Sequence, residues 1–177
     1  MSCSTPEGPL SGATNKATAG VLTVSDSCAR GERKDVSGAA VERGLTLHGF
    51  QVIARSMVAD ERGAIQEKLI GMCRLARLVV TTGGTGIAPR DVTPEATRAV
   101  CERLIEGIAE EMRAQGIRKT RFAALSRAVC GVRGTSLILN LPGSPEGAVE
   151  SLEAVIDLLP HALELIAGKT EHEKGSH

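Results

Sequence analysis

The sequence predicts an α/β fold, a three-layer α/β/α sandwich with a mostly parallel sheet and one antiparallel edge strand. Short apolar runs rich in β-branched residues alternate with segments whose apolar residues recur every three or four positions. That alternation is typical of a parallel sheet covered by helices. Towards the end, the runs AVCGV and SLILNL are separated only by RGT, which favours a hairpin or bulged pair with one antiparallel strand.

The first half of the chain contains two expected strands, Gly20–Val24 and Phe50–Val58, and two expected helices. A polar loop, Asp26–Asp35, follows the first strand, and Gly49 is suited to ending the first helix. Asp60 is a candidate cap for the second helix. The apolar stripes of these helices consist of Ala40, Val41, Leu45 and Leu47, and of Ile65, Leu69, Met72, Cys73 and Ala76.

The second half begins with Leu78–Thr82, an apolar run typical of a central parallel strand. Thr93 is expected to cap the next helix, with Pro94 in its first position. Ser144 and Pro145 are expected to begin the last helix in the same way. The first of these helices has a long stripe that could divide at Gly107, and the last should kink or split at Pro160. The stripes are Ala96, Val100, Leu104, Ile108 and Met112, then Leu152, Val155, Ile156, Leu159, Leu163 and Ile166.

The 177 residues predict one folded domain, residues 18–168, between a flexible segment 1–17 and a flexible tail 169–177. Positive and negative side chains balance at 21 each, and Trp and Tyr are absent, which argues against a nucleic-acid partner. No signal peptide and no apolar run of about 20 residues is recognised, so we expect a cytoplasmic protein without a membrane partner. Five scattered cysteines without C-x-x-C favour neither a disulfide framework nor a zinc site.

Three loops of unusual composition follow expected strands: SDSCARGERKD, TTGGTGIAPRDVT and NLPGSPEG. Ligands of open α/β sheets bind beyond the carboxyl ends of the strands, so we expect these loops to build one pocket. Gly83–Gly86 could present consecutive amides to an anion, although a plain turn has the same composition. Ser144 and the first amides of its helix form a second candidate, with an ordinary connection as the alternative. Ser126, Arg127 and Arg133 are further candidate phosphate donors, unless they are merely solvated.

Two carboxylates stand out beside these loops. Asp91 lies two residues before Thr93, and Asp60 follows the second strand. Magnesium binds proteins through one or two carboxylates together with substrate phosphates. For Asp60 the alternative is a helix cap, whereas Asp91 has less need of that role because Thr93 can supply the cap. Asp26 and Asp35 could be turn residues.

Taken together, these motifs resemble the molybdopterin adenylyltransferase family, the MogA-type and MoaB-type proteins of molybdenum cofactor biosynthesis, which includes the amino-terminal domain of gephyrin. The resemblance covers nearly the whole expected domain. It rests on LTVSDS at Leu22, VADE at Val58, VVTTGGTGIAPRDVTPEAT at Val79, LSRAVCGVRGTSLILNLPGSPEG at Leu125 and LLPHAL at Leu158. The string TTGGTG-x-x-x-x-D-V-T-P-E-A-T is the most specific of them.

The resemblance implies transfer of AMP from Mg-ATP to the terminal phosphate of molybdopterin, with release of pyrophosphate. It implies a homotrimer and a hand-over of the product to the molybdenum insertion enzyme. Asp60 and Asp91 would be the catalytic carboxylates and the Mg²⁺ ligands. The residues implied to bind nucleotide or pterin are Ser25, Asp26, Gly83, Gly84, Thr85, Gly86, Ser126, Pro142, Gly143 and Ser144.

Two other functions stay open at this point. The chain could be a catalytically weak paralogue that binds molybdopterin as a carrier or interaction module, or it could be a scaffold. The presence of Asp60, Asp91 and the GGTG loop favours the enzyme. The lack of Trp and Tyr leads us to expect adenine to be held by aliphatic groups and backbone hydrogen bonds.

Overall fold

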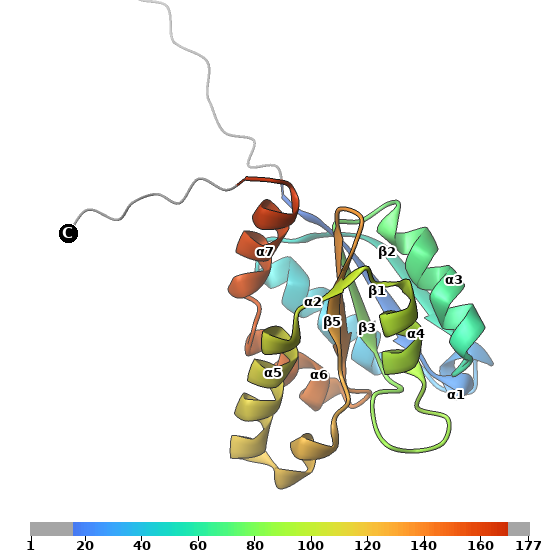
Figure 1. Cartoon of the computed structure of the whole chain (residues 1–177). Helices are drawn as coiled ribbons and strands as arrows, with labels where there is room; N and C mark the ends of the chain where they lie inside the picture. The colour runs from blue at the N-terminus through green and yellow to red at the C-terminus, as the bar shows by residue number, and fades with distance from the viewer. Residues whose placement is uncertain (1–15, 170–177) are drawn as a thin grey trace, which may run out of the picture.

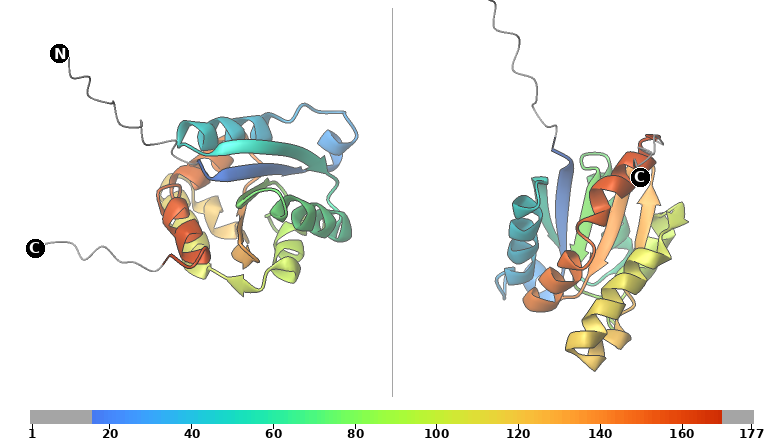
Figure 2. Two further views of the ribbon diagram at one scale, coloured as in Figure 1. Left: turned by 90° about the horizontal axis from the view of Figure 1, so that it is seen from above. Right: turned by 90° about the vertical axis from the view of Figure 1, so that its left-hand side faces the viewer.

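A six-stranded sheet with the strand order β2-β1-β3-β6-β5-β4 forms the centre of the protein, and helices cover both of its faces (Figures 1 and 2). The computed structural model describes residues 16–169, so the flexible segments expected at 1–17 and 169–177 lie almost entirely outside it. The strands are β1 (Thr18–Val24), β2 (Gln51–Val58), β3 (Leu78–Thr82), β4 (Arg103–Leu104), β5 (Cys130–Arg133) and β6 (Ser136–Leu141).

The helices divide into two layers, as the alternating sequence pattern predicted. One layer consists of α3 (Arg62–Cys73) and α4 (Thr93–Val100). The other consists of α2 (Val36–Leu47), α5 (Glu106–Lys119), α6 (Pro145–Glu153) and α7 (Leu158–Ile166). Two short segments, α1 (Asp26–Ala29) and the 3₁₀ helix η1 (Arg121–Leu125), complete the structure. None of the helices within residues 16–169 has the length and hydropathy that a bilayer crossing requires.

The sheet is mostly parallel, which confirms the predicted fold class. Strands β2, β1, β3 and β6 run parallel, and β5 runs antiparallel to β6 in the predicted hairpin. The antiparallel strand is not at the edge, however, because the two residues of β4 pair with β5 on its outer side. The backbone amides of Glu102 and Ile105 donate to carbonyls of β5 and so cover it.

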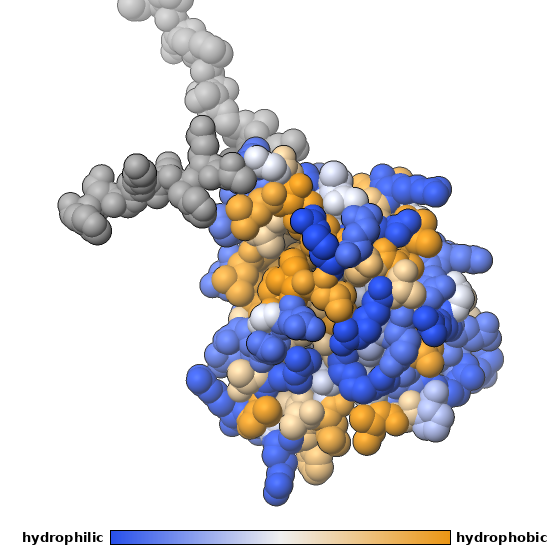
Figure 3. Space-filling view, in the orientation of Figure 1, coloured by the Kyte–Doolittle hydropathy of each residue, from blue (hydrophilic) through white to orange (hydrophobic). Residues whose placement is uncertain are grey.

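Strand β4 also corrects the predicted long helix. The stripe from Ala96 to Met112 was expected to form one helix that could divide at Gly107, but it divides earlier, between the end of α4 at Val100 and the start of α5 at Glu106. Leu104 therefore lies in a strand and is 38% exposed. It is one of several exposed apolar side chains, and Figure 3 shows hydrophobic residues gathered on the face that carries α5, α7 and this edge of the sheet.

Three smaller differences concern helix ends. Part of the expected polar loop forms α1, a single turn that Ser25 caps by accepting from the Cys28 amide. Leu47 lies outside the buried stripe of α2 and is 84% exposed, although Gly49 does follow the helix with a φ of 86°. The split of the last helix is confirmed, but it precedes Pro160. That residue lies in the first turn of α7, where a missing N–H costs no helical hydrogen bond.

Asn140 connects the central strands to the helix beside them. It is completely buried in β6, and its Nδ2 donates to the hydroxyl oxygens of Thr81 and Thr97 at 3.0 and 2.9 Å. Its Oδ1 accepts from the Val129 amide. The side chain thereby ties β3, β6 and α4 together at the first residue of the NLPGSP segment.

We expect Asn140→Ala to lower the free energy of unfolding by about 2–4 kcal/mol, because it removes these hydrogen bonds and leaves buried polar groups unpaired. Chemical denaturation of both proteins measures the difference. Thr135→Ala, in the exposed hairpin turn, is the control and should change stability by no more than about 0.5 kcal/mol. An equal effect of the two substitutions would contradict the proposed role of Asn140.

Candidate active site

The three loops expected to meet do so at the carboxyl end of the sheet. Strands β1, β3 and β6 are neighbours, so the loops that leave them lie side by side. The first and last described residues, Lys16 and Lys169, border a common cavity at the opposite end of the sheet (Figures 1 and 2).

Two glycines allow the three loops to approach this closely. Gly83 has a φ of 105°, and a Cβ added there would lie 2.2 Å from the carbonyl oxygen of Val24 at the end of β1. Gly84 has a φ of 64°, and its Cβ would lie 2.4 Å from the Thr93 hydroxyl. Any other residue would be both strained and obstructed at these positions.

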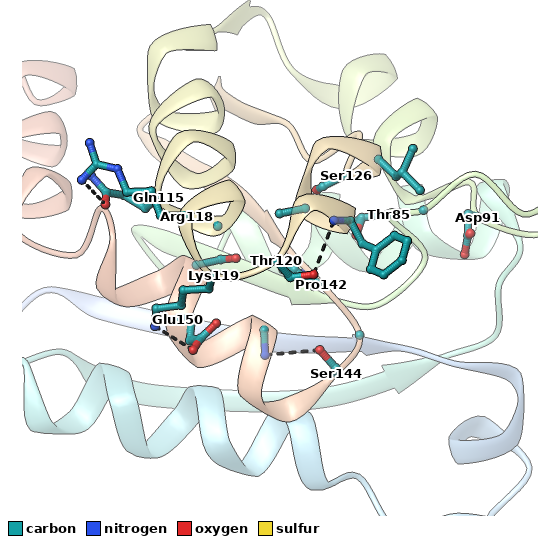
Figure 4. Close-up of a pocket in the computed structure, with 18 of the residues that line it drawn as sticks. Thr85, Asp91, Gln115, Arg118, Lys119, Thr120, Ser126, Pro142, Ser144 and Glu150 are labelled. Atoms are coloured by element: carbon teal, nitrogen blue, oxygen red, sulfur yellow. Dashed lines mark hydrogen bonds and ion pairs between the residues drawn. The ribbon is translucent and has the colours of Figure 1, made fainter.

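Two cavities meet at this loop and share Gly84, Asp91 and Gly143. The large cavity, of about 620 Å³, extends along α5, η1 and the start of α6 (Figure 4). The small cavity, of about 280 Å³, lies between the end of β1 and the start of α2. Of the residues implied by the resemblance, Thr85, Gly86, Ser126, Pro142 and Ser144 border the large cavity, and Ser25, Asp60 and Gly83 border the small one.

Asp60 is held by Asp26 rather than serving as a helix cap. The Asp26 amide donates to Asp60 Oδ2 at 2.9 Å, and the Asp60 amide donates to Asp26 Oδ1 at 3.0 Å. Glu61 occupies the cap position of α3, so the alternative of a cap is wrong for Asp60. Asp26 borders neither cavity, so the binding role that the resemblance implies for it stays a prediction. In the structure its contacts position Asp60.

Arg90 completes this arrangement. Its Nε and one terminal nitrogen donate to the two oxygens of Asp26 at 2.6 and 2.8 Å. The Arg90 hydrogen bonds hold the pKa of Asp26 below its usual value. Burial, in contrast, raises the pKa of Asp60, and the negative charges of Asp26 and Asp91 act in the same direction.

The raised pKa of Asp60 predicts a dependence of stability on pH. A carboxyl whose pKa is higher in the folded state destabilises the fold once it ionises. The free energy of unfolding therefore falls as pH rises through the folded pKa. We expect Asp60→Asn to have a higher melting temperature than the wild type at about pH 7, and the advantage to vanish below the ordinary pKa of aspartate. Melting temperatures across this range measure it. A variant that is less stable at neutral pH would contradict the prediction.

Asp91 lies where the two cavities join. Its Oδ2 accepts from the Ala88 amide at 2.8 Å and lies 2.8 Å from the position of a Cβ on Gly86. Thr93 does not cap α4, because the cap position belongs to Val92. The buried Thr93 hydroxyl instead donates to the carbonyl of Gly83 at 2.9 Å and fastens the glycine loop to the helix.

Arg127 holds the same loop from the other side. Its Nε donates to the Gly86 carbonyl at 2.7 Å, a terminal nitrogen donates to the Asp91 carbonyl at 2.5 Å, and it pairs with Glu95. The expectation of a phosphate donor is therefore wrong for Arg127, which positions the loop. It is also wrong for Arg133, whose side chain donates to the Val100 carbonyl and borders neither cavity.

The far side of the large cavity consists of residues that the sequence patterns did not single out. Figure 4 shows Lys119 of α5 and Glu150 of α6 facing each other, with Ser144 nearby as the cap of α6. Lys119 Nζ and Glu150 Oε1 are 2.6 Å apart. Phe122 also borders this cavity and is 73% exposed. Their place depends on how α5 folds back beside α6, which local patterns do not reveal.

The chain also matches a known protein family over most of its length. Residues 20–161 match a family described as a probable molybdopterin binding domain. The chain belongs to this molybdopterin-binding family. The matched range runs from within β1 to the first residues of α7, and so contains all three loops of the site.

Individual members of the molybdopterin-binding family are similar over most of the chain. The molybdopterin adenylyltransferase of Helicobacter pylori (strain J99) is 44% identical over 153 residues, covering 84% of this chain and 87% of that protein. The crystal structure of the molybdopterin biosynthesis enzyme MoaB from Thermus thermophilus matches with a TM-score of 0.81 and a sequence identity of 53%. The match covers 86% of this chain and 98% of the MoaB chain. The Drosophila melanogaster molybdenum cofactor synthesis protein cinnamon is 43% identical over 165 residues, which are 90% of this chain but only 27% of the fly protein.

The carboxylates of this molybdopterin-binding domain suit a magnesium ion that the substrate helps to hold. Asp60 and Asp91 border the same small cavity, and the Oδ1 atom of each accepts no hydrogen bond from residues 16–169. Within that range no cluster of three or more His, Cys, Asp or Glu side chains could bind a metal by itself. Two carboxylate oxygens plus phosphate oxygens of a nucleotide are the ligands that Mg²⁺ commonly uses.

Proposed function

We propose that this protein is a molybdopterin adenylyltransferase that transfers AMP from Mg-ATP to the terminal phosphate of molybdopterin and releases pyrophosphate. The observation that carries the proposal is the junction of two cavities at Gly84, Asp91 and Gly143. A transfer reaction needs two substrates in contact at one point, and this junction provides it. The adenylyltransferase of Helicobacter pylori, with which the chain shares 44% identity over most of both lengths, supports the same activity.

In the reaction, an oxygen of the molybdopterin phosphate bonds to the α-phosphorus of ATP, and the bond from that phosphorus to the β-bridging oxygen breaks. Pyrophosphate takes the bonding electrons as it leaves. No nucleophile from the protein is needed, so the residues act by positioning and by stabilising charge.

The residues at and around the junction of the two cavities have separate roles in this reaction. Asp60 and Asp91 would hold Mg²⁺, which when bound neutralises negative charge on the phosphates. Gly83–Gly86 would approach a phosphate through the backbone. Asp26 and Arg90 orient Asp60, while Arg127 fixes the carbonyl of Asp91 and the loop beside it.

The large cavity would receive molybdopterin. Its lining combines apolar side chains such as Phe122 and Leu125, which suit a ring system, with the start of α6, which suits a phosphate. The expectation that aliphatic and backbone groups hold adenine stays a prediction.

A turnover assay tests the proposal. The protein is incubated with ATP, MgCl₂ and molybdopterin, and the products are identified by mass spectrometry. We expect adenylylated molybdopterin and an equal amount of pyrophosphate. Saturable binding of molybdopterin without product would favour the alternative of a carrier or interaction module.

The homotrimer, the cytoplasmic location and the hand-over to a molybdenum insertion enzyme stay predictions. The exposed apolar residues on the face with α5, α7 and β4 support assembly, since such surfaces commonly mark protein contacts (Figure 3). Light scattering of the purified protein measures the subunit number directly.

A further inference from the structure

The small cavity is bordered by a buried hydroxyl group that has no partner among residues 16–169. Thr23, at the end of β1, is only 2% exposed, and its Oγ1 is a buried atom with no hydrogen-bond partner in the described structure. Ser37, in the first turn of α2, borders the same cavity and is 8% exposed. A buried hydroxyl without a partner is unfavourable, so an atom from outside the protein is expected to satisfy it.

Positive charge accompanies these hydroxyls. The cavity includes the beginning of α2, a helix of 12 residues whose amino end carries partial positive charge. Asp35 caps this end, but its carboxylate is occupied by the Gly38 amide and by Arg55. Arg33 and Lys34 border the cavity as well, and neither forms an ion pair within the described part of the chain. The donors at this end are thus suited to an anion.

The small cavity is also bordered by two acidic residues. Asp60 and Asp91 line it together with Gly83 and Gly84. A free anion would be repelled by these carboxylates, whereas an anion that shares a Mg²⁺ ion with them would be attracted. The cavity therefore favours an anion with several oxygens, one end on the metal and the other on the α2 donors.

We propose that the small cavity is the subsite for the pyrophosphate portion of ATP, which Thr23, Ser37, Arg33 and Lys34 bind before and after it leaves. This assignment rests on the proposed function. In-line displacement puts the leaving group and the attacking oxygen on opposite sides of the α-phosphorus. The two cavities share Gly84, Asp91 and Gly143, so with the attacking phosphate in the large cavity the pyrophosphate would leave into the small one.

The large cavity is less suited to pyrophosphate. Its Lys119 is already paired with Glu150, and its Arg118 donates to Gln115. Its volume of about 620 Å³ and its apolar side chains favour a larger, partly apolar ligand.

Calorimetry with inorganic pyrophosphate and MgCl₂, in the absence of molybdopterin, tests the assignment. We expect Thr23→Val and Lys34→Ala each to weaken pyrophosphate binding about tenfold, because each removes a donor to a charged ligand. Thr46→Val and Lys68→Ala are the matched controls, since both residues are exposed and border neither cavity, and they should bind as the wild type does. Omitting Mg²⁺ should weaken binding in every protein.

Three outcomes separate this inference from the proposed function. If adenylyl transfer occurs but Thr23→Val and Lys34→Ala bind pyrophosphate as the wild type does, the subsite assignment is wrong and the proposed function stands. The same conclusion follows if Lys119→Ala is the variant that loses pyrophosphate binding. If Mg-dependent pyrophosphate binding follows the expected pattern but no transfer occurs, the subsite stands and the proposed enzyme activity fails. Thermal melts of each variant show that a loss of binding is not a loss of folding.

Discussion

Asp91→Asn is expected to reduce the rate of adenylyl transfer at least about 100-fold while leaving the fold intact. The substitution removes a negative charge at the point where the two cavities join. Asparagine retains an oxygen that can accept from the Ala88 amide, so the loop should keep its conformation. The effect should therefore appear in kcat and in the dependence on Mg²⁺, with little change in melting temperature.

Asp157→Asn is the matched control for this substitution. Asp157 is exposed before α7, makes no cap hydrogen bond and borders neither cavity, so its replacement should leave the rate unchanged. Product formation by Asp91→Asn at the wild-type rate would remove Asp91 from the proposed mechanism.

Gly83→Ala is expected to be the most disruptive single change in the loop. The new Cβ would meet the Val24 carbonyl oxygen at 2.2 Å, and the backbone φ of 105° is strained for alanine. We expect a loss of at least about 2 kcal/mol in the free energy of unfolding. Because the glycine loop must move away from β1, transfer should also fall by about 100-fold, as misplacement by about 1 Å can cause.

Gly71→Ala gives the comparison for that result. Gly71 lies in α3 with no atom within 4 Å of its added Cβ, so alanine should be neutral or stabilising by up to about 1 kcal/mol. Denaturation and turnover of the two variants measure the difference. If Gly83→Ala behaved like Gly71→Ala, the close contact of the loop with β1 would not matter for the site.

The sequence was sufficient to predict the layers of the fold and the meeting of the three loops. The buried run Leu78–Thr82 and the strand–helix alternation are local signals, and strand ends in a parallel sheet converge by geometry. β4 escaped prediction because its two residues form a strand only by pairing with β5, a tertiary contact that overrides the helical pattern around Leu104.

The side-chain partners were harder to predict. Thr93 and Asp60 are residue types that commonly cap helices. In the structure, however, Thr93 donates to the Gly83 carbonyl and Asp60 accepts from the Asp26 amide. Arg127 could not be recognised as a positioning residue, because its partners Gly86 and Asp91 lie far from it in the sequence. Local propensity describes what a residue can do in its own segment, whereas these roles arise only when segments meet.

The fate of labelled phosphate tests the central claim most directly. ATP labelled at the α-phosphorus or at the γ-phosphorus is incubated with the protein, MgCl₂ and molybdopterin, and the pterin product is separated from pyrophosphate. Adenylyl transfer predicts that the α-label enters the pterin and the γ-label leaves as pyrophosphate. Entry of the γ-label into the pterin, or bound molybdopterin that acquires neither label, would contradict the account.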